Sequence, residues 1–342
     1  AGLRNPIDLT VEGTGEHYGK AAATALLEND SSVILYIGTP YLKAMPTAEG
    51  IVSAAKETGK PIAAVMQVGP DIDESLACLR REGIPCFPSG ERAVSVISAM
   101  AAYEDIKSRA AEPCFETAEP SGHAFISGEN RLLEPDAMAL LRENGISVPE
   151  FRFAKNEEEA AEAAEKIGFP VVVKVVSPEI VHKSDRGGVA LGVGDADGVR
   201  EAFRRMRGIC DGGDFRGVVV YPMLKAGKEA IIGLTNDPTF GPVVAFGMGG
   251  VYTEVLRDIT FRVAPVSEIQ ALGMIREIKM YPLLRGTRGE APIDESALAG
   301  TIAAFSRLSS RYPDISEADL NPVFLYENGV VAADARILGK QK

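Results

Sequence analysis

The chain has 342 residues, a net charge of −12 at pH 7 and 25% charged residues, a composition typical of a globular protein with room for two or three domains. The negative charge argues against a nucleic-acid-binding surface. No apolar run approaches the length needed to cross a membrane, and Cys78, Cys86, Cys114 and Cys210 lack a metal-binding spacing. We therefore expect a cytoplasmic protein that binds neither nucleic acid nor a membrane.

The N-terminal part of the chain alternates short apolar runs with helical patterns. The apolar runs cover 32–38, 61–68 and 84–88, and the helical patterns cover 17–29, 47–58, 72–82 and 90–108. Strands that alternate with helices at this spacing predict a small doubly wound parallel sheet, and hence an α/β fold, over residues 1–108. An Asp71-x-x-Glu74 capping box is expected to open the third helix.

Residues 109–129 have no sustained period and scattered Pro, Ser and Gly, which is typical of a linker. The pattern restarts at residue 130 and continues to residue 342. Helices are predicted at 134–143, after Asn156, at 197–207 and at 294–310, and strands around Lys174 and at 189–193, 217–223 and 229–234. Near the C-terminus, Asn328-Gly329 predicts a type I′ turn between two strands.

Lys174 lies at the centre of the β-branched run PVVVKVV. An unpaired ammonium group in a core strand is costly or loses its proton. Lys174 therefore either lies on an edge strand and reaches water, or faces a permanent anionic partner.

The loop HKSDRGG follows this strand and contains His182. A lone histidine is usually structural or solvated, as we expect for His17 and His123. His182 differs because a lysine, a serine and two glycines surround it, and a neutral imidazole can accept a phosphoryl group.

Two further features are suited to holding a nucleotide. Gly247-x-Gly249-Gly250 would let backbone N–H groups approach phosphates, although glycines also mark bulges and turns. Asn321 and Asp334 carry oxygen atoms of the kind that hard cations prefer, and the predicted hairpin brings them near each other. The alternative is a turn amide and a surface carboxylate.

Four blocks of this sequence resemble the ATP-grasp half of the ADP-forming acyl-CoA synthetases, which are related to succinyl-CoA synthetase. The blocks are PVVVKVVSPEIVHKSDRGGVALGV, KEAIIGLTNDPTFGPVVAFGMGGVYTEVLRD, RGTRG and EADLNPVFLYENGVVAADARI, and they follow the family's order. Residues 3–108 resemble the flavodoxin-like ligase domain of the same enzymes. The resemblance implies a flavodoxin-like domain followed by an ATP-grasp fold of two α+β subdomains, the smaller of them a lid at about 151–225.

The resemblance also implies a role for each matched residue. For the nucleotide, Lys174 would bind the phosphates of ATP or ADP, Tyr221-Pro222-Met223 would hold the adenine, Glu229 would lie near the ribose, and Gly249 and Gly250 would line the site. Asn321 and Asp334 would hold Mg²⁺. For phosphoryl transfer, Asp319 would lie close to a phosphohistidine, and His182 would accept the phosphoryl group in a second relay step.

The family reaction is acyl-CoA + ADP + Pi ⇌ acid + CoA + ATP, through an acyl phosphate and a phosphohistidine. The family's CoA-binding domain and its domain with the principal phosphohistidine have no counterpart in this sequence. We therefore expect a fragment of a longer polypeptide or one subunit of an oligomer, which acts with those domains on a small carboxylic acid or its CoA thioester. Two alternatives stay open: a regulatory module of the kind fused to protein acetyltransferases, and an ATP-grasp carboxylate–amine ligase.

Overall fold

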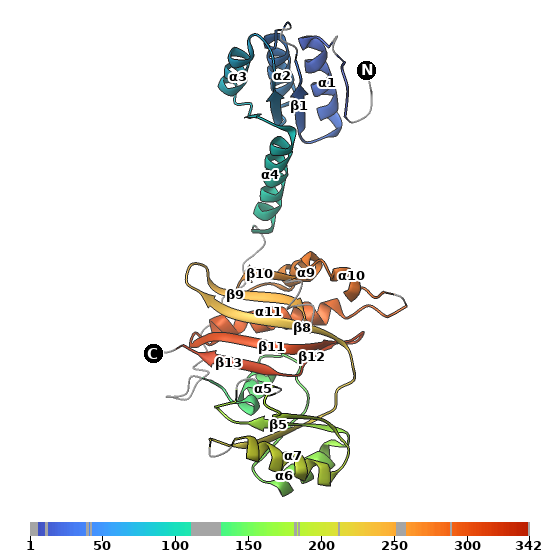
Figure 1. Ribbon diagram of the computed structural model, residues 1–342, viewed down its shortest axis with the longest axis vertical. Coiled ribbons are helices and arrows are strands. Elements are labelled where there is room, and N and C mark those ends of the chain that lie inside the picture. The colour runs from blue at the N-terminus through green and yellow to red at the C-terminus, as the bar shows by residue number, and fades with distance from the viewer. Residues whose placement is uncertain are drawn as a thin grey trace. The chain divides into compact units, whose positions relative to one another are not determined.

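The computed structural model describes residues 6–10, 13–38, 41, 43–110, 131–180, 183, 185–210, 213–250, 258–287 and 289–340. The chain divides into two compact units, residues 1–113 and 114–342. The ribbon of each unit is shown in Figure 1.

The N-terminal unit is a three-stranded parallel sheet of order β1-β2-β3 with helices on both faces. The central strand is buried along its whole length, with Ala63 and Val65 packed against α4 and Ile62 and Ala64 in the core formed with the other helices. Burial on both faces explains why this strand is a continuous apolar run, and the predicted doubly wound sheet is confirmed. The elements are α1 (Gly15–Glu28), β1 (Ser32–Tyr36), α2 (Met45–Thr58), β2 (Ile62–Met66), α3 (Ile72–Arg81), β3 (Cys86–Phe87) and α4 (Gly90–Ala110).

The predicted capping box of α3 is wrong. The Asp71 side chain makes no capping hydrogen bond to its own helix. It accepts hydrogen bonds instead from the backbone N–H groups of Ala44 (2.6 Å) and Met45 (3.0 Å), at the start of α2. Ala44 has no side-chain acceptor for the free N–H groups of that helix, so a carboxylate from a distant segment takes them.

The C-terminal unit contains two antiparallel sheets. The large sheet has the order β10-β9-β8-β11-β12, with β13 also paired to β11, and the small sheet has the order β4-β7-β5-β6. Helices α9 and α11 pack against the large sheet, α6 and α7 pack against the small sheet, and α5 lies between β13 and β5 (Figure 1).

The elements of this unit are α5 (Glu134–Glu143), β4 (Arg152–Ala154), α6 (Glu157–Ile167), β5 (Val171–Val176), β6 (Val189–Val193), α7 (Ala196–Ile209), β7 (Gly217–Pro222), β8 (Lys228–Asp237), β9 (Gly241–Met248), β10 (Ile259–Val263), α9 (Glu268–Glu277), α10 (Tyr281–Leu284), α11 (Glu295–Arg311), β11 (Ile315–Leu325), β12 (Val330–Ala332) and β13 (Ala335–Gly339).

The two faces of β5 contribute to different cores. Val173 and its alternate neighbours pack with α6 and α7, whereas Val172 and Val176 belong to the core of the large sheet. Because side chains alternate along a strand, Lys174 shares the second face and is directed toward α5 and the large sheet. The strand lies between β7 and β6, so Lys174 is not on an edge strand.

The turn between β11 and β12 lies one residue earlier than predicted. Val323 pairs with Ala332, which centres the turn on Glu327–Asn328 rather than on Asn328-Gly329. Gly329 follows the turn with φ of 94°, a left-handed backbone conformation that favours glycine. The Asn-Gly pair therefore predicts the correct loop, but Gly329 follows the two central residues of the turn instead of being one of them.

Two expectations from composition can be compared with the structure. Cys78, Cys86 and Cys210 are free thiols in the described part of the chain. Among the described residues, no helix has both the length and the hydropathy needed to span a bilayer. The cytoplasmic location stays a prediction.

Candidate functional site

A buried cluster of charged side chains joins the two sheets of the C-terminal unit. Its centre is the carboxylate of Glu134, the first residue of α5, whose side chain is only 2% exposed. Lys174 donates a hydrogen bond to Glu134 Oε1 at 2.9 Å, and Lys183 Nζ lies 2.6 Å from Oε2. The hydroxyl group of Tyr221, on β7, donates to Oε1 at 2.8 Å. Three donors from the small sheet and its loop thus converge on one carboxylate.

A second carboxylate, Asp334, contacts the same two lysines from the outer side. Lys183 donates to Asp334 Oδ1 at 3.2 Å, and Lys174 Nζ lies 3.4 Å from Oδ2. Lys174 also donates to the backbone oxygen of Ala333 at 2.8 Å. The side chain of Asp334 is 27% exposed, so the lysines lie between an inner, buried carboxylate and an outer one.

The charges in this cluster stabilise one another. Burial alone would raise the pKa of Glu134, but attraction to Lys174 and Lys183 outweighs it and lowers the pKa to about 2. Burial alone would lower the pKa of Lys183, and the two carboxylates raise it above its ordinary value instead. Burial and the neighbouring Glu134 raise the pKa of the Tyr221 hydroxyl. Of the two possibilities for Lys174, the structure therefore shows the permanent anionic partner.

Arg131 lies beside this cluster, and one of its N–H donors is not used by the described residues. Its Nε is buried and has no hydrogen-bond acceptor among the described residues, while its Nη1 donates to the backbone oxygen of Ile180 at 3.4 Å. Burial and the nearby Arg336 lower the pKa of Arg131, and Asp334 is among the carboxylates that oppose this. Since buried donors normally have partners, an anionic group in this region would complete the arrangement.

The predicted metal ligands and Asp319 lie at the junction of β11 and β13. Asn321, on β11, donates its backbone N–H to the backbone oxygen of Asp334, between β12 and β13, at 3.2 Å, so the two predicted ligands are neighbours. Asp319 accepts a hydrogen bond from Arg336 Nε at 2.8 Å, and Arg336 also binds Glu317. In the part of the chain that the structure describes, no group of three or more His, Cys, Asp or Glu residues could hold a metal. A cation bound by Asn321 and Asp334 would need further oxygens from elsewhere, such as those of phosphates.

Glu229, Gly249 and Gly250 come together where β8 begins and β9 ends. Gly249 donates its N–H to Glu229 O at 2.7 Å, and a Cβ on Gly249 would lie 3.0 Å from Glu229 Cβ. Gly250 has φ of 68°, a conformation that favours glycine. Close approach to Glu229 favours glycine at 249, and the positive φ favours it at 250, so the backbone lies close to the exposed Glu229 here.

Tyr221 and Pro222 end β7, and Met223 follows them where the chain leaves the small sheet for β8. Tyr221 is buried, while Met223 is 43% exposed and donates its N–H to Pro170 O at 3.0 Å. His182 lies outside the described residues. Lys183, the next residue along the chain, is in the charged cluster.

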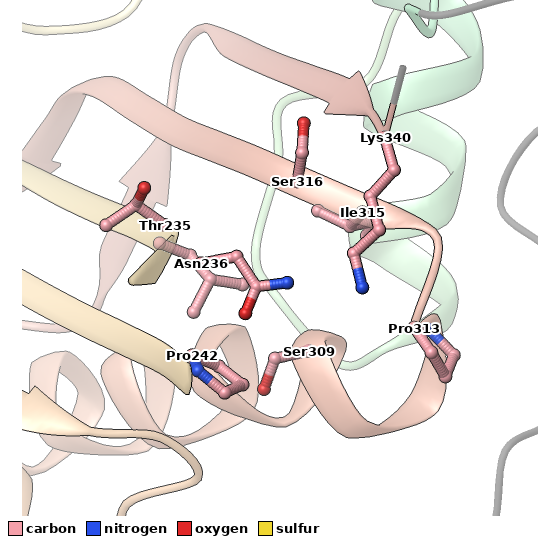
Figure 2. Close-up of a pocket in the computed structure, with 9 residues that line it drawn as sticks. Thr235, Asn236, Pro242, Ser309, Pro313, Ile315, Ser316 and Lys340 are labelled. Atoms are coloured by element: carbon pink, nitrogen blue, oxygen red, sulfur yellow. The ribbon is translucent and has the colours of Figure 1, made fainter. Parts of the chain in front are cut away.

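A separate pocket of about 220 Å³ lies at another place on the large sheet, near the C-terminal end of α11 (Figure 2). It is lined by Leu234, Thr235, Asn236, Pro242, Ser309, Pro313, Ile315, Ser316 and Lys340. None of the predicted site residues lines it. The carbonyl end of a helix also disfavours an anion, so this pocket is a poor place for a nucleotide's phosphates.

Neither Glu134 nor Arg131 is among the site residues predicted from the sequence. The segment RLLEPDAM reads as the start of a helix, and a glutamate in the first turn of a helix is ordinary. Only the fold brings this carboxylate to Lys174. Lys183 is next to His182 in the sequence, but spacing does not predict its pairing with the same carboxylate.

Comparison with known proteins shows the family of this chain. The ATP-grasp domain family matches residues 123–338. The acetate–CoA ligase [ADP-forming] I of Archaeoglobus fulgidus is 38% identical over 98% of this chain and 50% of its own length. The acetate–CoA ligase [ADP-forming] I subunit beta of Pyrococcus furiosus is 49% identical over 61% of this chain and 93% of its own length.

Two solved structures that resemble this chain belong to an enzyme of the same kind as these relatives. The dinucleotide forming acetyl-coenzyme A synthetase 1 of Ca. Korarchaeum cryptofilum, in complex with coenzyme A, Ca-AMPCP and HgCl⁺, has a TM-score of 0.61 and 43% identity, and the match covers 62% of this chain and 95% of that chain. The same synthetase in complex with coenzyme A and Mg-AMPPCP, its phosphohistidine segment pointing towards the nucleotide binding site, has a TM-score of 0.56 and 42% identity over 62% of this chain and 94% of that one.

The chain therefore belongs to the ATP-grasp family, among the ADP-forming acyl-CoA synthetases. It contains the ATP-grasp part of these enzymes and spans about half the length of the A. fulgidus ligase. The fold expected from the resemblance, an α/β unit with a parallel sheet followed by an ATP-grasp unit, is confirmed.

Proposed function

We propose that this chain is the nucleotide-binding and phosphoryl-transfer part of an ADP-forming acyl-CoA synthetase, which interconverts acyl-CoA, ADP and phosphate with acid, CoA and ATP. The observation that carries the proposal is the pair of buried lysines, Lys174 and Lys183, beside the spare donor of Arg131. The relatives named above are all acid–CoA ligases or synthetases, which favours this function over a regulatory module or a carboxylate–amine ligase.

The residues of the cluster fit the phosphates of ATP or ADP. Ammonium and guanidinium groups form strong charge-assisted hydrogen bonds to phosphate oxygens, so Lys174, Lys183 and Arg131 would bind them. Gly249 and Gly250, which carry no side chain, would let the backbone lie close to the nucleotide, with Glu229 near its ribose. Tyr221, Pro222 and Met223 would hold the adenine.

Asn321 and Asp334 would hold Mg²⁺. The donor set fits, since the carboxylate of Asp334 and the amide oxygen of Asn321 are hard ligands on neighbouring residues, and phosphate oxygens would complete the coordination. When bound, the ion would neutralise charge on the phosphates during transfer. The Mg-AMPPCP in the related synthetase supports this assignment.

His182 would accept the phosphoryl group on its ring nitrogen and pass it on, with Asp319 near the phosphohistidine. Lys183 in the cluster supports this, since it immediately follows His182 in the sequence. Arg336 orients the Asp319 carboxylate by a 2.8 Å hydrogen bond. The phosphohistidine segment of the related synthetase, which points towards its nucleotide binding site, fits a relay of this kind.

The partners would be a CoA-binding domain and a domain with the principal phosphohistidine, together with CoA and a small carboxylic acid or its thioester. The A. fulgidus relative, about twice the matched length, and the separate β subunit of P. furiosus support either one longer polypeptide or an assembly of subunits. We further propose that the complete enzyme is oligomeric and cytoplasmic.

Replacing Asp334 with Asn should remove the advantage that Mg²⁺ gives to ADP binding. Calorimetric titration of the wild-type chain with ADP should show about tenfold higher affinity with Mg²⁺ than with EDTA, because Asn321 and Asp334 would hold the ion close to the phosphates. In Asp334→Asn the two affinities should become nearly equal. A variant that keeps the full Mg²⁺ effect would place the metal elsewhere.

A further inference from the structure

The cluster around Glu134 assigns different tasks to its two carboxylates, and the inference rests on the nucleotide site proposed above. Lys174 and Lys183 come from different segments, the middle of β5 and the loop after it. Each ammonium group contacts a different oxygen of Glu134, at 2.9 and 2.6 Å. Two cations this close repel each other, so a carboxylate that contacts both is needed to keep them side by side.

The two carboxylates differ in depth. The side chain of Glu134 is 2% exposed and that of Asp334 is 27% exposed, with the lysines, both 10% exposed, between them. Each lysine also lies farther from Asp334, at 3.4 and 3.2 Å, than from Glu134. An anion that reaches the lysines from solvent would therefore meet them on the side of Asp334 and leave their contacts with Glu134 in place.

The hydrogen-bonding capacity of the lysines agrees with this division. An ammonium group has three N–H donors. Lys174 uses two of them on Glu134 Oε1 and on the backbone oxygen of Ala333, which leaves one for the outer side. Glu134 Oε1 accepts from both Lys174 and Tyr221, and Oε2 lies 2.6 Å from Lys183 Nζ, so all three groups face the inner carboxylate.

We propose that Glu134 is a positioning residue, which holds Lys174 and Lys183 together so that both can bind the nucleotide's phosphates. Asp334 is the exchangeable partner: the phosphates replace it beside the lysines, and its carboxylate would then be free to hold the metal ion. The two carboxylates, which look equivalent as counter-ions, thus have opposite effects on ADP binding when no metal is present.

Calorimetric titration with ADP in EDTA separates these effects. Glu134→Gln keeps the shape of the side chain but replaces one acceptor oxygen with an NH₂ donor, so one lysine loses its place. Its affinity for ADP should fall about tenfold or more, the equivalent of losing one charge-assisted hydrogen bond. Asp334→Asn removes a competitor for the lysines, and its affinity should rise about threefold or more because repulsion of the phosphates is lost.

Asp136→Asn is the matched control, since Asp136 lies in the same first turn of α5 and is exposed. It should bind ADP as the wild type does, to within about twofold, because an exposed charge is screened. Glu134→Asp should recover part of the affinity lost in Glu134→Gln. Thermal melts of each variant identify loss of fold, and if Glu134→Gln does not fold, Glu134→Asp and Asp334→Asn still decide.

ADP binding to Glu134→Gln at wild-type strength, or weaker ADP binding to Asp334→Asn in EDTA, would overturn the inference while leaving the proposed function intact. Absence of ADP binding to the wild-type chain would overturn the proposed function itself.

Discussion

Lys174→Met should lower the affinity of the chain for ADP by about tenfold to hundredfold, since each charge-assisted hydrogen bond to phosphate contributes about 1.5–3 kcal/mol. Lys174 is in the central part of the small sheet, with its side chain 10% exposed and directed at the large sheet. Met has a similar length and suits the apolar strand. Glu134 keeps its contacts with Lys183 and Tyr221, so the fold should be retained at lower thermal stability.

Lys166→Met is the control for this experiment. Lys166 lies in the last turn of α6, with its side chain 60% exposed and 3.6 Å from Glu162. Exposed ion pairs of this kind contribute little to stability. Calorimetry should show unchanged ADP affinity for Lys166→Met. Equal affinities for Lys174→Met and the wild type would show that Lys174 is only a structural counter-ion of Glu134.

His182→Ala should abolish phosphoryl exchange between the nucleotide and the partner domains, while ATP affinity stays near that of the wild type. The reason is that the imidazole would carry the phosphoryl group, whereas Lys174 and Arg131 would bind the nucleotide. With γ-phosphate-labelled ATP, the wild-type chain should form an acid-labile, base-stable adduct that the variant lacks.

His17→Ala serves as the control for His182. The Nδ1 atom of His17 accepts a hydrogen bond from the backbone N–H of Thr14 at the start of α1, which confirms the structural role expected for this histidine. Its loss should leave the labelling unchanged. Full turnover by His182→Ala, reconstituted with the missing domains, would mean that phosphoryl transfer takes a direct route.

Most of the fold follows from local patterns in the sequence. The alternation of strands and helices predicts the parallel sheet, and Asn156 does accept the hydrogen bond from Glu159 N–H that begins α6. Long-range partners were harder to predict. Asp71 caps a helix that begins 26 residues earlier in the chain, which no local spacing shows. The position of the hairpin turn depends on the register of β11 and β12, in which Leu325 pairs with Val330, and the Asn-Gly pair alone does not determine that register.

In the candidate site too, local sequence predicts some features, and only the fold brings the others together. A lysine in a β-branched strand predicts either an edge position that reaches water or an anionic partner, because a buried charge must be paired. The partner turned out to be Glu134, forty residues away, which only the packing of α5 between the two sheets brings into contact. The neighbouring positions of Asn321 and Asp334 could be expected from the hairpin, since paired strands place them opposite each other.

The most direct test of the central claim is product analysis with the complete protein, this chain together with its CoA-binding and phosphohistidine domains. It would be incubated with ATP, Mg²⁺, CoA and a panel of small carboxylic acids. With the proposed function, one or more acids should give acyl-CoA, ADP and phosphate in equal amounts. Formation of AMP and pyrophosphate, or no acyl-CoA formation with any acid although the protein is folded and binds CoA, would contradict it.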